Sequence, residues 1–316
     1  MRVNIHGLID SAKCYEMVRE LRWGGKIECP DCHAPEIVKN GLDETPPHRQ
    51  RYLCRMCNRS FDDLTKTVFS GSHHPLSIWM LCLYFMGLNL SNRQIAFELE
   101  MNENTIQEMT TILRSGIVVQ EPTITLEGTV ECDEVYVVAG HKGHPESVKK
   151  KRRFARKRRL KSQRGRGTAA VDKPPILGMI QRGGQVVLRV LDNVKQATIE
   201  PIIKTFIKSG TLVNTDEYCI YDRLPEWGYE HKSVCHSHGE YARDEDGDGF
   251  HEVHVNTMEG FWSLLRSWLR PHRGVSQERL PEYVGFFQFV HNVRRRGNAL
   301  LRSLVETLVA NNPIAG

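Results

Sequence analysis

Residues 125–140 read TLEGTVECDEVYVVAG, and this stretch decides the fold of the largest part of the chain. Its valines predict a strand, and a period of two puts Glu131 and Asp133 on one face. Cys132 and Glu134 then lie on the opposite face. Acidic groups inside a valine-rich strand are costly to bury unless their charge binds something. The stretch therefore predicts a strand that carries charged, ligand-binding side chains.

The next segments predict further strands around this one. Residues 175–192 (PILGMIQRGGQVVLRVLD) are typical of a β-hairpin that turns at residues 182–184. The stretch TIEPIIKTFIKSG predicts an amphipathic helix that ends at Gly210. A short strand follows over 212–214, with Asp216 just past its C-terminal end, the edge where α/β sheets place ligand-binding groups.

Residues 254–266 (HVNTMEGFWSLLR) predict a helix that carries a third acid, Glu259. Its polar residues Asn256, Glu259 and Arg266 lie roughly along one side. Four apolar residues at intervals of three and four form a docking stripe, namely Met258, Phe261, Trp262 and Leu265. Trp262 is interpreted either as a core residue of this stripe or as a contact to a nucleic acid.

Three strands, a helix, a fourth strand with an acid at its tip and a later acid-bearing helix form an RNase H-like layout. In this layout Asp133 on the first strand faces Asp216, and Glu259 comes alongside. Phosphodiester cleavage through two Mg²⁺ ions roughly 3.5–4 Å apart needs carboxylates that hold both ions, and hard oxygen ligands suit Mg²⁺. The predicted fold class is α/β, a mixed sheet with helices.

Two CxxC pairs, Cys29–Cys32 and Cys54–Cys57, predict a zinc ribbon near the N-terminus. Two residues between thiolates allow a tight turn to present both sulfurs to one tetrahedral Zn²⁺, and four protein ligands make the site structural. Two coincidental pairs are the alternative. The odd total of nine cysteines favours a reducing compartment over a disulfide framework. A basic face is expected on the ribbon from Arg49, Arg51, Arg55 and Arg59.

The chain divides into three predicted parts. Residues 1–65 form the zinc ribbon, 66–120 a helical, helix-turn-helix-like DNA-binding segment, and 125–316 the RNase H-like domain with a basic insertion at 146–168. In the second part Ser91 is the expected N-cap of one helix, and a second helix is expected to start at Thr105. Plain helical packing is the alternative for this part, because the second helix has few basic residues.

Positive charge is concentrated in one run. Residues 149–168 hold twelve Lys or Arg and no acid, whereas the whole chain has a net charge of only +5. Such a run typically binds a polyanion. The expected DNA contacts lie in this run and after the last aromatic helix, at Arg152, Arg153, Arg156, Lys157, Arg158, Arg159, Arg294, Arg295 and Arg296.

Taken in order, these motifs resemble the zinc-ribbon DDE transposases of bacterial and archaeal insertion sequences, the ISXO-like group, over nearly the whole chain. The resemblance rests on CPDC and CRMC, ECDEVYV, RGRGT before PILGMI, NTDEYCIYDRL, HVNTMEGFWSLLR and EYVGFFQFVHNVRRRGN. It implies an enzyme that cuts double-stranded DNA at terminal inverted repeats with metal-activated water. The released 3′-hydroxyls then attack target DNA without a covalent protein–DNA intermediate.

The resemblance also implies which residues act. Asp133 and Asp216 match the first two acids, and Arg266 matches the downstream basic residue. The third position is Glu or Asn in this group. Glu259 is the expected ligand because a carboxylate binds Mg²⁺ more strongly than an amide, and Asn256 is either a supporting hydrogen-bonding residue or the ligand itself. The expected metals are one structural Zn²⁺ and two catalytic Mg²⁺, which Mn²⁺ could replace.

Two element ends must be brought together, so a homodimer or larger assembly on DNA is expected. The N-terminus lacks a signal pattern, and the most apolar stretch, 78–88, is too short to cross a membrane. A cytoplasmic, nucleoid-associated prokaryotic protein is therefore expected, with no membrane partner. The rival hypotheses are a zinc-ribbon DNA-binding regulator derived from an inactive transposase and a nuclease that cleaves without joining.

Several other polar residues need an interpretation. Glu131 shares a face with Asp133 and is a candidate supporting residue, whereas Glu134 and Glu217 fall on the opposite face. Residues 244–249 (DEDGDG) fit the start of a calcium loop, but its twelfth position is Val255, so an acidic turn is favoured. A second zinc site is an alternative to surface or DNA-contacting roles for His231, His236, His238, His251 and His254.

Overall fold

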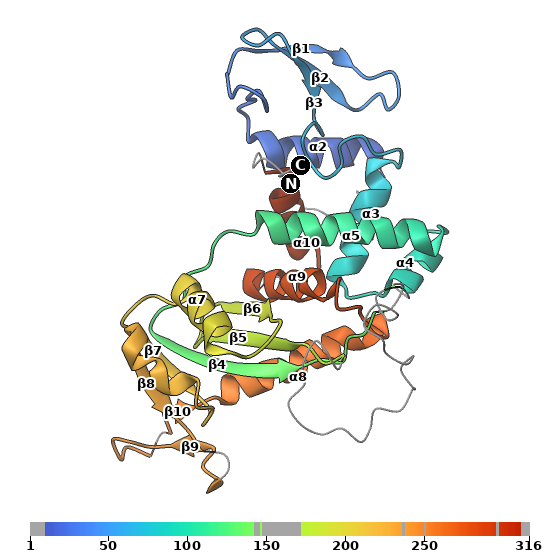
Figure 1. Cartoon of the computed structure of the whole chain (residues 1–316). Helices are drawn as coiled ribbons and strands as arrows, with labels where there is room; N and C mark the ends of the chain where they lie inside the picture. The colour runs from blue at the N-terminus through green and yellow to red at the C-terminus, as the bar shows by residue number, and fades with distance from the viewer. Residues whose placement is uncertain are drawn as a thin grey trace. The chain divides into compact units, whose positions relative to one another are not determined.

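The computed structural model describes residues 10–141, 146, 172–235, 238–249, 251–294 and 297–310 (Figure 1). The chain forms two compact units. Unit 1 comprises Met1–Glu121 and Val293–Gly316, and unit 2 comprises Pro122–Asn292. The ribbon and the helical segment belong to unit 1, and the acid-bearing strands belong to unit 2.

Unit 1 begins with a helix and a small antiparallel sheet. Helix α2 (Ser11–Trp23) is capped by Asp10, whose carboxylate accepts from the first backbone N–H groups. The sheet has the order β1 (Ile37–Leu42), β2 (Gln50–Cys54) and β3 (Ser60–Asp62). Short antiparallel strands next to two CxxC pairs are what the predicted zinc ribbon requires.

The ribbon has an aromatic core and one buried acid. Trp23, Tyr52 and Phe61 pack together with ring centroids 5.2–6.1 Å apart. Asp63 is fully buried and accepts from the Tyr52 hydroxyl at 2.9 Å and from Arg19 Nη2 at 2.7 Å. Because Arg19 comes from α2, this pair ties the helix to the ribbon.

The helical part of unit 1 consists of α3 (Leu76–Gly87), α4 (Asn92–Glu98), α5 (Glu103–Gln120) and α10 (Gly297–Val309). Ser91 caps α4 in a capping box with Gln94, as predicted. Helix α5 begins two residues before the predicted Thr105, because Asn102 caps it. Helix α10 packs against α2, α3 and α5, so residues 293–316, which the sequence analysis assigned to the third part, fall in unit 1.

Unit 2 is built on a five-stranded mixed sheet in the order β6-β5-β4-β7-β8. Its strands are β4 (Thr129–Tyr136), β5 (Pro175–Gln181), β6 (Val186–Val190), β7 (Leu212–Thr215) and β8 (Glu230–Ser233). The first three strands are antiparallel neighbours, and β7 runs parallel to both β4 and β8. In chain order this is 3-2-1-4-5, an RNase H-like arrangement, in which the first four strands were predicted and β8 was not.

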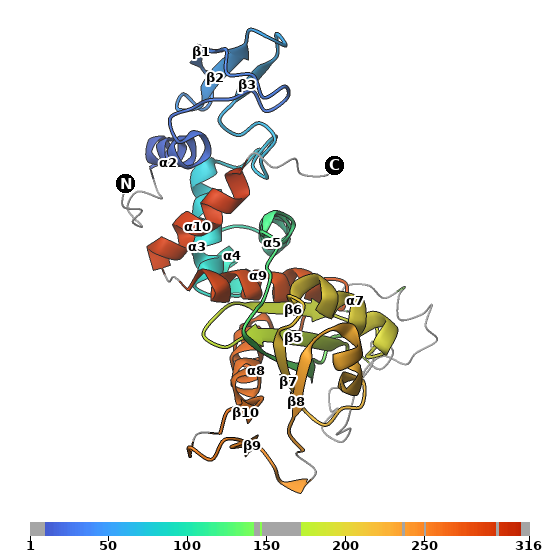
Figure 2. The ribbon, with the colours of Figure 1, turned by 90° about the vertical axis from the view of Figure 1, so that its left-hand side faces the viewer.

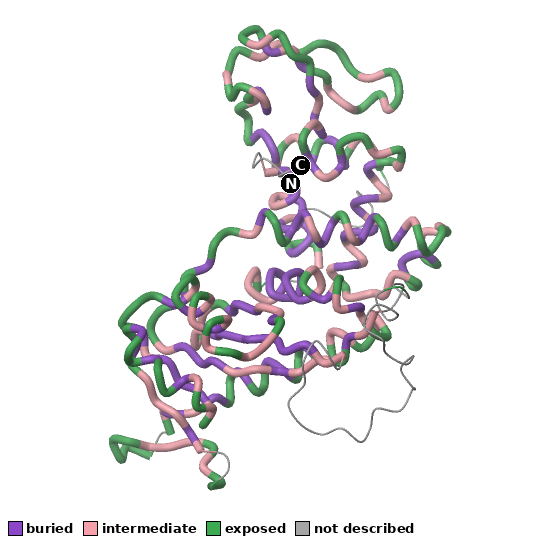
Figure 3. Tube along the Cα trace, in the orientation of Figure 1, coloured by how far each residue is buried: buried purple, intermediate pink, exposed green. Residues whose placement is uncertain are grey.

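Helices cover both faces of this sheet (Figure 2). Helix α7 (Gln196–Phe206) packs over one face, where β4 contributes Val130 and Cys132 to the core. The opposite face carries α8 (Asn256–Leu269) and α9 (Leu280–Val293), packed against Val135 and the β5–β6 hairpin. Buried residues run through the central strands (Figure 3), which explains why β4 is rich in valine.

Unit 2 also contains short connecting elements, and its helix α7 ends earlier than predicted. The main elements are connected by a two-stranded sheet and by short 3₁₀ turns. The sheet consists of β9 (Ala242–Arg243) and β10 (Val253–His254), and the turns are Tyr221–Arg223, Pro225–Trp227 and Arg270–His272. The predicted end of α7 at Gly210 is wrong: the helix ends at Phe206. It ends early because Ile207 leaves the helix to bridge Leu126 at the edge of the sheet.

Candidate functional site

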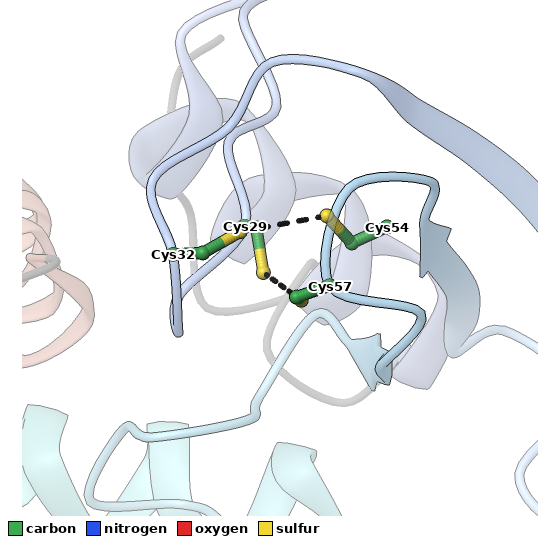
Figure 4. Close-up of side chains that lie close together, drawn as sticks. All are labelled: Cys29, Cys32, Cys54 and Cys57. Atoms are coloured by element: carbon green, nitrogen blue, oxygen red, sulfur yellow. Dashed lines mark hydrogen bonds between the residues drawn. The ribbon is translucent and has the colours of Figure 1, made fainter.

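The four predicted zinc ligands meet in the ribbon. The sulfur atoms of Cys29, Cys32, Cys54 and Cys57 all lie within 4.8 Å of one another. Figure 4 shows the two knuckles facing each other, with 3.6 Å between the sulfurs of Cys29 and Cys57 and between those of Cys32 and Cys54. Backbone N–H groups, that of Cys57 foremost, lower the pKa of Cys54 to about 7. A four-sulfur cluster is consistent with Zn²⁺.

In unit 2, Asp133 lies on β4, and Asp216 follows the neighbouring parallel strand β7. The register pairs Glu131 of β4 with Asn214 of β7, and Asp133 and Asp216 each come two residues after this pair. Asp216 comes directly after β7 and accepts from the Tyr218 N–H at 3.0 Å. Asp133 contacts Trp262 of α8, and the charge of Asp216 acts on the Asp133 carboxylate.

Asp133 is the most perturbed acid of this group. Burial, together with the charges of Asp216 and Glu259, raises its pKa to about 6. Hydrogen bonds from the Trp262 indole and the Glu134 N–H act in the opposite direction. The charge effect shows that Asp216 and Glu259 each lie within electrostatic range of Asp133, although the three acids are far apart in the sequence.

Trp262 orients the Asp133 carboxylate. Its indole Nε1 donates to Asp133 Oδ2 at 2.8 Å, and the residue is only 3 % exposed. The indole can lie against the sheet because Gly178 is the β5 partner of Asp133. A Cβ atom at Gly178 would come within 2.4 Å of the Trp262 ring and the Met258 methyl group. Trp262 is thus a core residue, which was one of the two interpretations of its position in the sequence. Its hydrogen bond to Asp133 was not predicted from the sequence.

The first turn of α8 carries both candidates for the third ligand. Asn256 is its first residue, and Glu259 lies one turn further; both are exposed. The Asn256 N–H donates to His254 Nδ1 at 3.3 Å. Burial, followed by the Arg182 charge, lowers the pKa of His254. Arg266 lies near the end of the same helix and is exposed.

Glu131 does not face solvent at all. It is fully buried, and its two oxygens accept from three donors. Arg182 Nε and the Thr257 hydroxyl both lie 2.8 Å from Oε1, and the Met258 N–H lies 2.9 Å from Oε2. The predicted supporting residue therefore contacts the N-terminus of α8. Its neighbour Glu134 accepts from the Tyr221 hydroxyl on the opposite face, as the alternation predicts.

The residues expected to contact DNA are only partly described. Arg152, Arg153, Arg156, Lys157, Arg158, Arg159, Arg295 and Arg296 lie outside the described residues. Arg294 is described and is exposed. In the ribbon Arg51, Arg55 and Arg59 are exposed, whereas Arg49 pairs with Asp43 and Asp62.

The helix-turn-helix-like segment presents little positive charge. Helix α5 exposes Glu103 and Glu108, and Arg114, its one basic residue, is buried. Phe97 of α4 is 81 % exposed. The exposed face of α5 is therefore not the basic surface that a groove-reading helix normally presents.

A second acidic cluster lies in the 244–252 loop. The ligand atoms of Asp244, Asp246 and Glu252 lie within 4.8 Å of one another. Sequence reasoning identified the two aspartates but not Glu252. Among the described residues this cluster and the four cysteines are the two groups that satisfy that distance, so Asp133, Asp216 and Glu259 are more widely spaced.

The described histidines have separate partners. His231 Nε2 lies 2.9 Å from the Thr215 hydroxyl, and His238 Nδ1 lies 2.8 Å from Cys235 Sγ. His236 lies outside the described residues.

Within the part of the chain that the structure describes, no helix is long and apolar enough to cross a membrane.

Two family models match the chain. Residues 125–292 match an ISXO2-like transposase domain, and residues 9–60 match a transposase zinc-ribbon domain. A protein in the transposable element ISH50 of Halobacterium salinarum is 35 % identical over 308 residues, which cover 96 % of this chain and 98 % of that protein. A transposase-like protein of Haemophilus influenzae is 27 % identical over 95 residues, covering 30 % of this chain and 71 % of that protein.

Two solved structures also align with the chain at low similarity. One is a simian T-cell lymphotropic virus intasome in complex with the PP2A regulatory subunit B56 gamma, with a TM-score of 0.30 and 11 % identity over 67 % of this chain and 74 % of that one. The other is a pre-cleavage Mos1 transpososome, with a TM-score of 0.26 and 8 % identity over 69 % of this chain and 71 % of that one.

Proposed function

Because the chain belongs to the ISXO2-like transposase family, we propose that it cuts the ends of an insertion sequence and joins the released 3′-hydroxyls to target DNA. The observation that carries this proposal is the position of Asp133 on β4 and of Asp216 directly after the neighbouring parallel strand β7. Glu259 lies close enough to contribute to the raised pKa of Asp133. Acids that repel one another in this way are typical of a cation site.

The residues at this site fit Mg²⁺. Asp133, Asp216 and Glu259 offer carboxylate oxygens, the ligands that Mg²⁺ and Mn²⁺ prefer. On β7, Asn214 is 1 % exposed, and its amide atoms have no hydrogen-bond partner among the described residues. The wide spacing of the three acids suits two ions that share ligands better than one ion that takes all of them. When bound, Mg²⁺ supplies positive charge that activates the attacking oxygen and stabilises the leaving oxygen.

The reaction consists of two balanced displacements. In cleavage, a water oxygen attacks the phosphorus at the element end, the P–O3′ bond breaks, and the 3′-oxygen takes up a proton. In joining, that 3′-oxygen attacks a target phosphorus, loses its proton and displaces a target 3′-oxygen, so the number of phosphodiester bonds is conserved. Asp133, Asp216 and Glu259 would hold the cations next to the reacting phosphate, and the exposed Arg266 is available to the DNA backbone.

We assign Glu259 rather than Asn256 as the third ligand. The assignment is supported by the effect of the Glu259 charge on Asp133 and by the stronger attraction of a carboxylate for a divalent cation. Asn256 lies on the same turn of α8, where it serves as a hydrogen-bonding residue next to the site.

We further infer that the zinc ribbon and the basic run at 149–168 make the main phosphate contacts. The exposed Arg51, Arg55 and Arg59 support this division, since α5 exposes acids instead. Joining two element ends to one target requires at least a dimer on DNA. The expected place of action is the prokaryotic nucleoid.

The test uses the full chain with Mg²⁺ and a supercoiled plasmid that carries the DNA flanking the gene on both sides. The expected products are 3′-hydroxyl ends at the element boundary and joined molecules. D133N and D216N should abolish both products while DNA binding persists. Full activity of either variant would contradict the site, and cleavage without joined products would favour the nuclease alternative.

A further inference from the structure

The N-cap residue of α8 provides no side-chain cap. The first backbone N–H groups of a helix need outside partners, and Ser, Thr, Asp or Asn usually provides one from the N-cap position. Here the N-cap position holds Val255, which makes no side-chain cap hydrogen bond. His254 Nδ1 accepts from the Asn256 N–H at 3.3 Å, so the N–H groups that follow are the ones that need a partner from elsewhere in the fold.

Glu131 occupies the place of the missing cap. Its Oε2 accepts from the Met258 N–H at 2.9 Å, and its Oε1 accepts from the Thr257 hydroxyl at 2.8 Å. Glu131 is 127 residues away from Met258 in sequence and belongs to β4, two residues before Asp133. A negative charge at this position also interacts favourably with the helix dipole.

Arg182 completes the arrangement from the β5–β6 turn. Its Nε donates to Glu131 Oε1 at 2.8 Å, which compensates the buried charge of the carboxylate. Its two other nitrogens donate to the carbonyl oxygens of Glu252 and His254 at 2.6 and 3.0 Å. Arg182 thus holds β10, the segment that leads directly into α8.

From these contacts we propose that Glu131 and Arg182 are a positioning pair that fixes the first turn of α8, with Asn256 and Glu259, opposite Asp133. Glu131 is not itself a metal ligand, since it is fully buried and its charge is already paired with Arg182. The proposal rests on the proposed function only in naming Glu259 as a ligand. The capping contact itself is independent of that function.

The first measurement needs no substitution. Amide hydrogen exchange of the metal-free, full-length protein should protect the Met258 N–H, although first-turn amides of a helix are ordinarily exposed to exchange. Exchange of Met258 at the rate of an unbonded amide would overturn the capping role. This result decides the cap even if the variants below fail to fold.

The second measurement compares E131Q and R182Q with E134Q. The E134Q variant is a matched control, because Glu134 lies on the same strand but on the opposite face, bonded to Tyr221. E131Q and R182Q should each speed exchange in the first turn of α8 and weaken Mn²⁺ binding, measured by titration calorimetry, by about tenfold or more. E134Q should leave both properties unchanged. The same Mn²⁺ affinity in all three variants and the wild type would overturn the positioning role.

A further variant separates this proposal from the proposed function. D133N should abolish Mn²⁺ binding if Asp133 is a ligand. If D133N binds Mn²⁺ normally, the proposed metal site is wrong, whereas exchange at Met258 still reports on the cap. If D133N loses Mn²⁺ while E131Q and R182Q retain it, the metal site stands and the positioning pair is wrong.

Discussion

The indole nitrogen of Trp262 donates a 2.8 Å hydrogen bond to Oδ2 of Asp133, from a residue 129 positions later in the chain. One docking residue of α8 is thereby in direct contact with a proposed metal ligand. Asp133 Oδ1 meanwhile accepts from the Glu134 N–H at 2.7 Å. Both carboxylate oxygens are held, so the orientation of Asp133 depends on how α8 packs.

W262F removes this donor and keeps an aromatic ring in the core. Because the indole bond lowers the pKa of Asp133, its loss should raise that pKa further. The acid limb of the pH–cleavage profile should move to higher pH, and cleavage at pH 7 should fall by about tenfold. W268F is the control: Trp268 lies on the same helix and packs against His272 and Phe287. An identical shift in W268F would mean that general packing, not the donor, is responsible.

Removing the Asp133 charge should stabilise the metal-free protein. Burial raises the pKa of this carboxyl from 3.8 to about 6, so the folded state binds its proton more tightly than the unfolded state does. Stability therefore falls as pH rises from 3.8 to about 6 and stays lower above that range. D133N should be more stable than the wild type by about 2 kcal/mol at about pH 7.5, and the gain should shrink toward about pH 4. Urea unfolding without added Mg²⁺ measures this; a gain independent of pH would contradict the assigned cause.

G178A should destabilise unit 2. The added Cβ would lie 2.4 Å from the Trp262 ring, a distance that forces the ring or the backbone to move. Overpacking of this kind typically costs about 1–3 kcal/mol, and the displaced indole should also weaken cleavage. G260A provides the contrast, since a Cβ there meets nothing within 4 Å and alanine favours a helix. Thermal unfolding should therefore show a lower Tm for G178A and an equal or higher Tm for G260A.

E259Q and N256A distinguish the two candidates for the third ligand. If Glu259 holds the metal, E259Q should abolish Mg²⁺-dependent cleavage, and N256A should reduce it by about tenfold through a lost hydrogen bond. The measurement is cleavage of the flanking-DNA plasmid as a function of Mg²⁺ concentration. Loss of cleavage in N256A alone would transfer the ligand role to Asn256.

Zinc removal should affect the two units differently. The ribbon core includes Cys29 and Cys54 themselves, so without the metal residues 29–57 should lose their order. Unit 2 has its own core and should keep its protected amides. C54S followed by hydrogen exchange and zinc analysis tests this expectation. Protected amides in the ribbon of a zinc-free sample would show that its aromatic core is sufficient to keep it folded.

The periodic features of the sequence predicted most of unit 2. Alternation in 129–136 placed Glu131 and Asp133 on one face because a strand repeats every two residues. The four stripe residues of α8 are all buried, since apolar side chains at intervals of three and four share one side of a helix. Boundaries were less predictable: α7 ends before Gly210 because a pairing with Leu126, distant in sequence, ends it.

The sequence by itself determined the four-cysteine cluster, the first four strands of unit 2 and the residues on each face of β4, because spacing and alternation are local properties of the chain. Only the tertiary structure decided that Glu131 caps α8 in place of Val255, that Gly178 admits the Trp262 ring, and that α10 packs with α2 rather than with the sheet. Each of these contacts joins residues far apart in the chain. Their partners are chosen by the packing of the sheet and helices, which no single segment encodes.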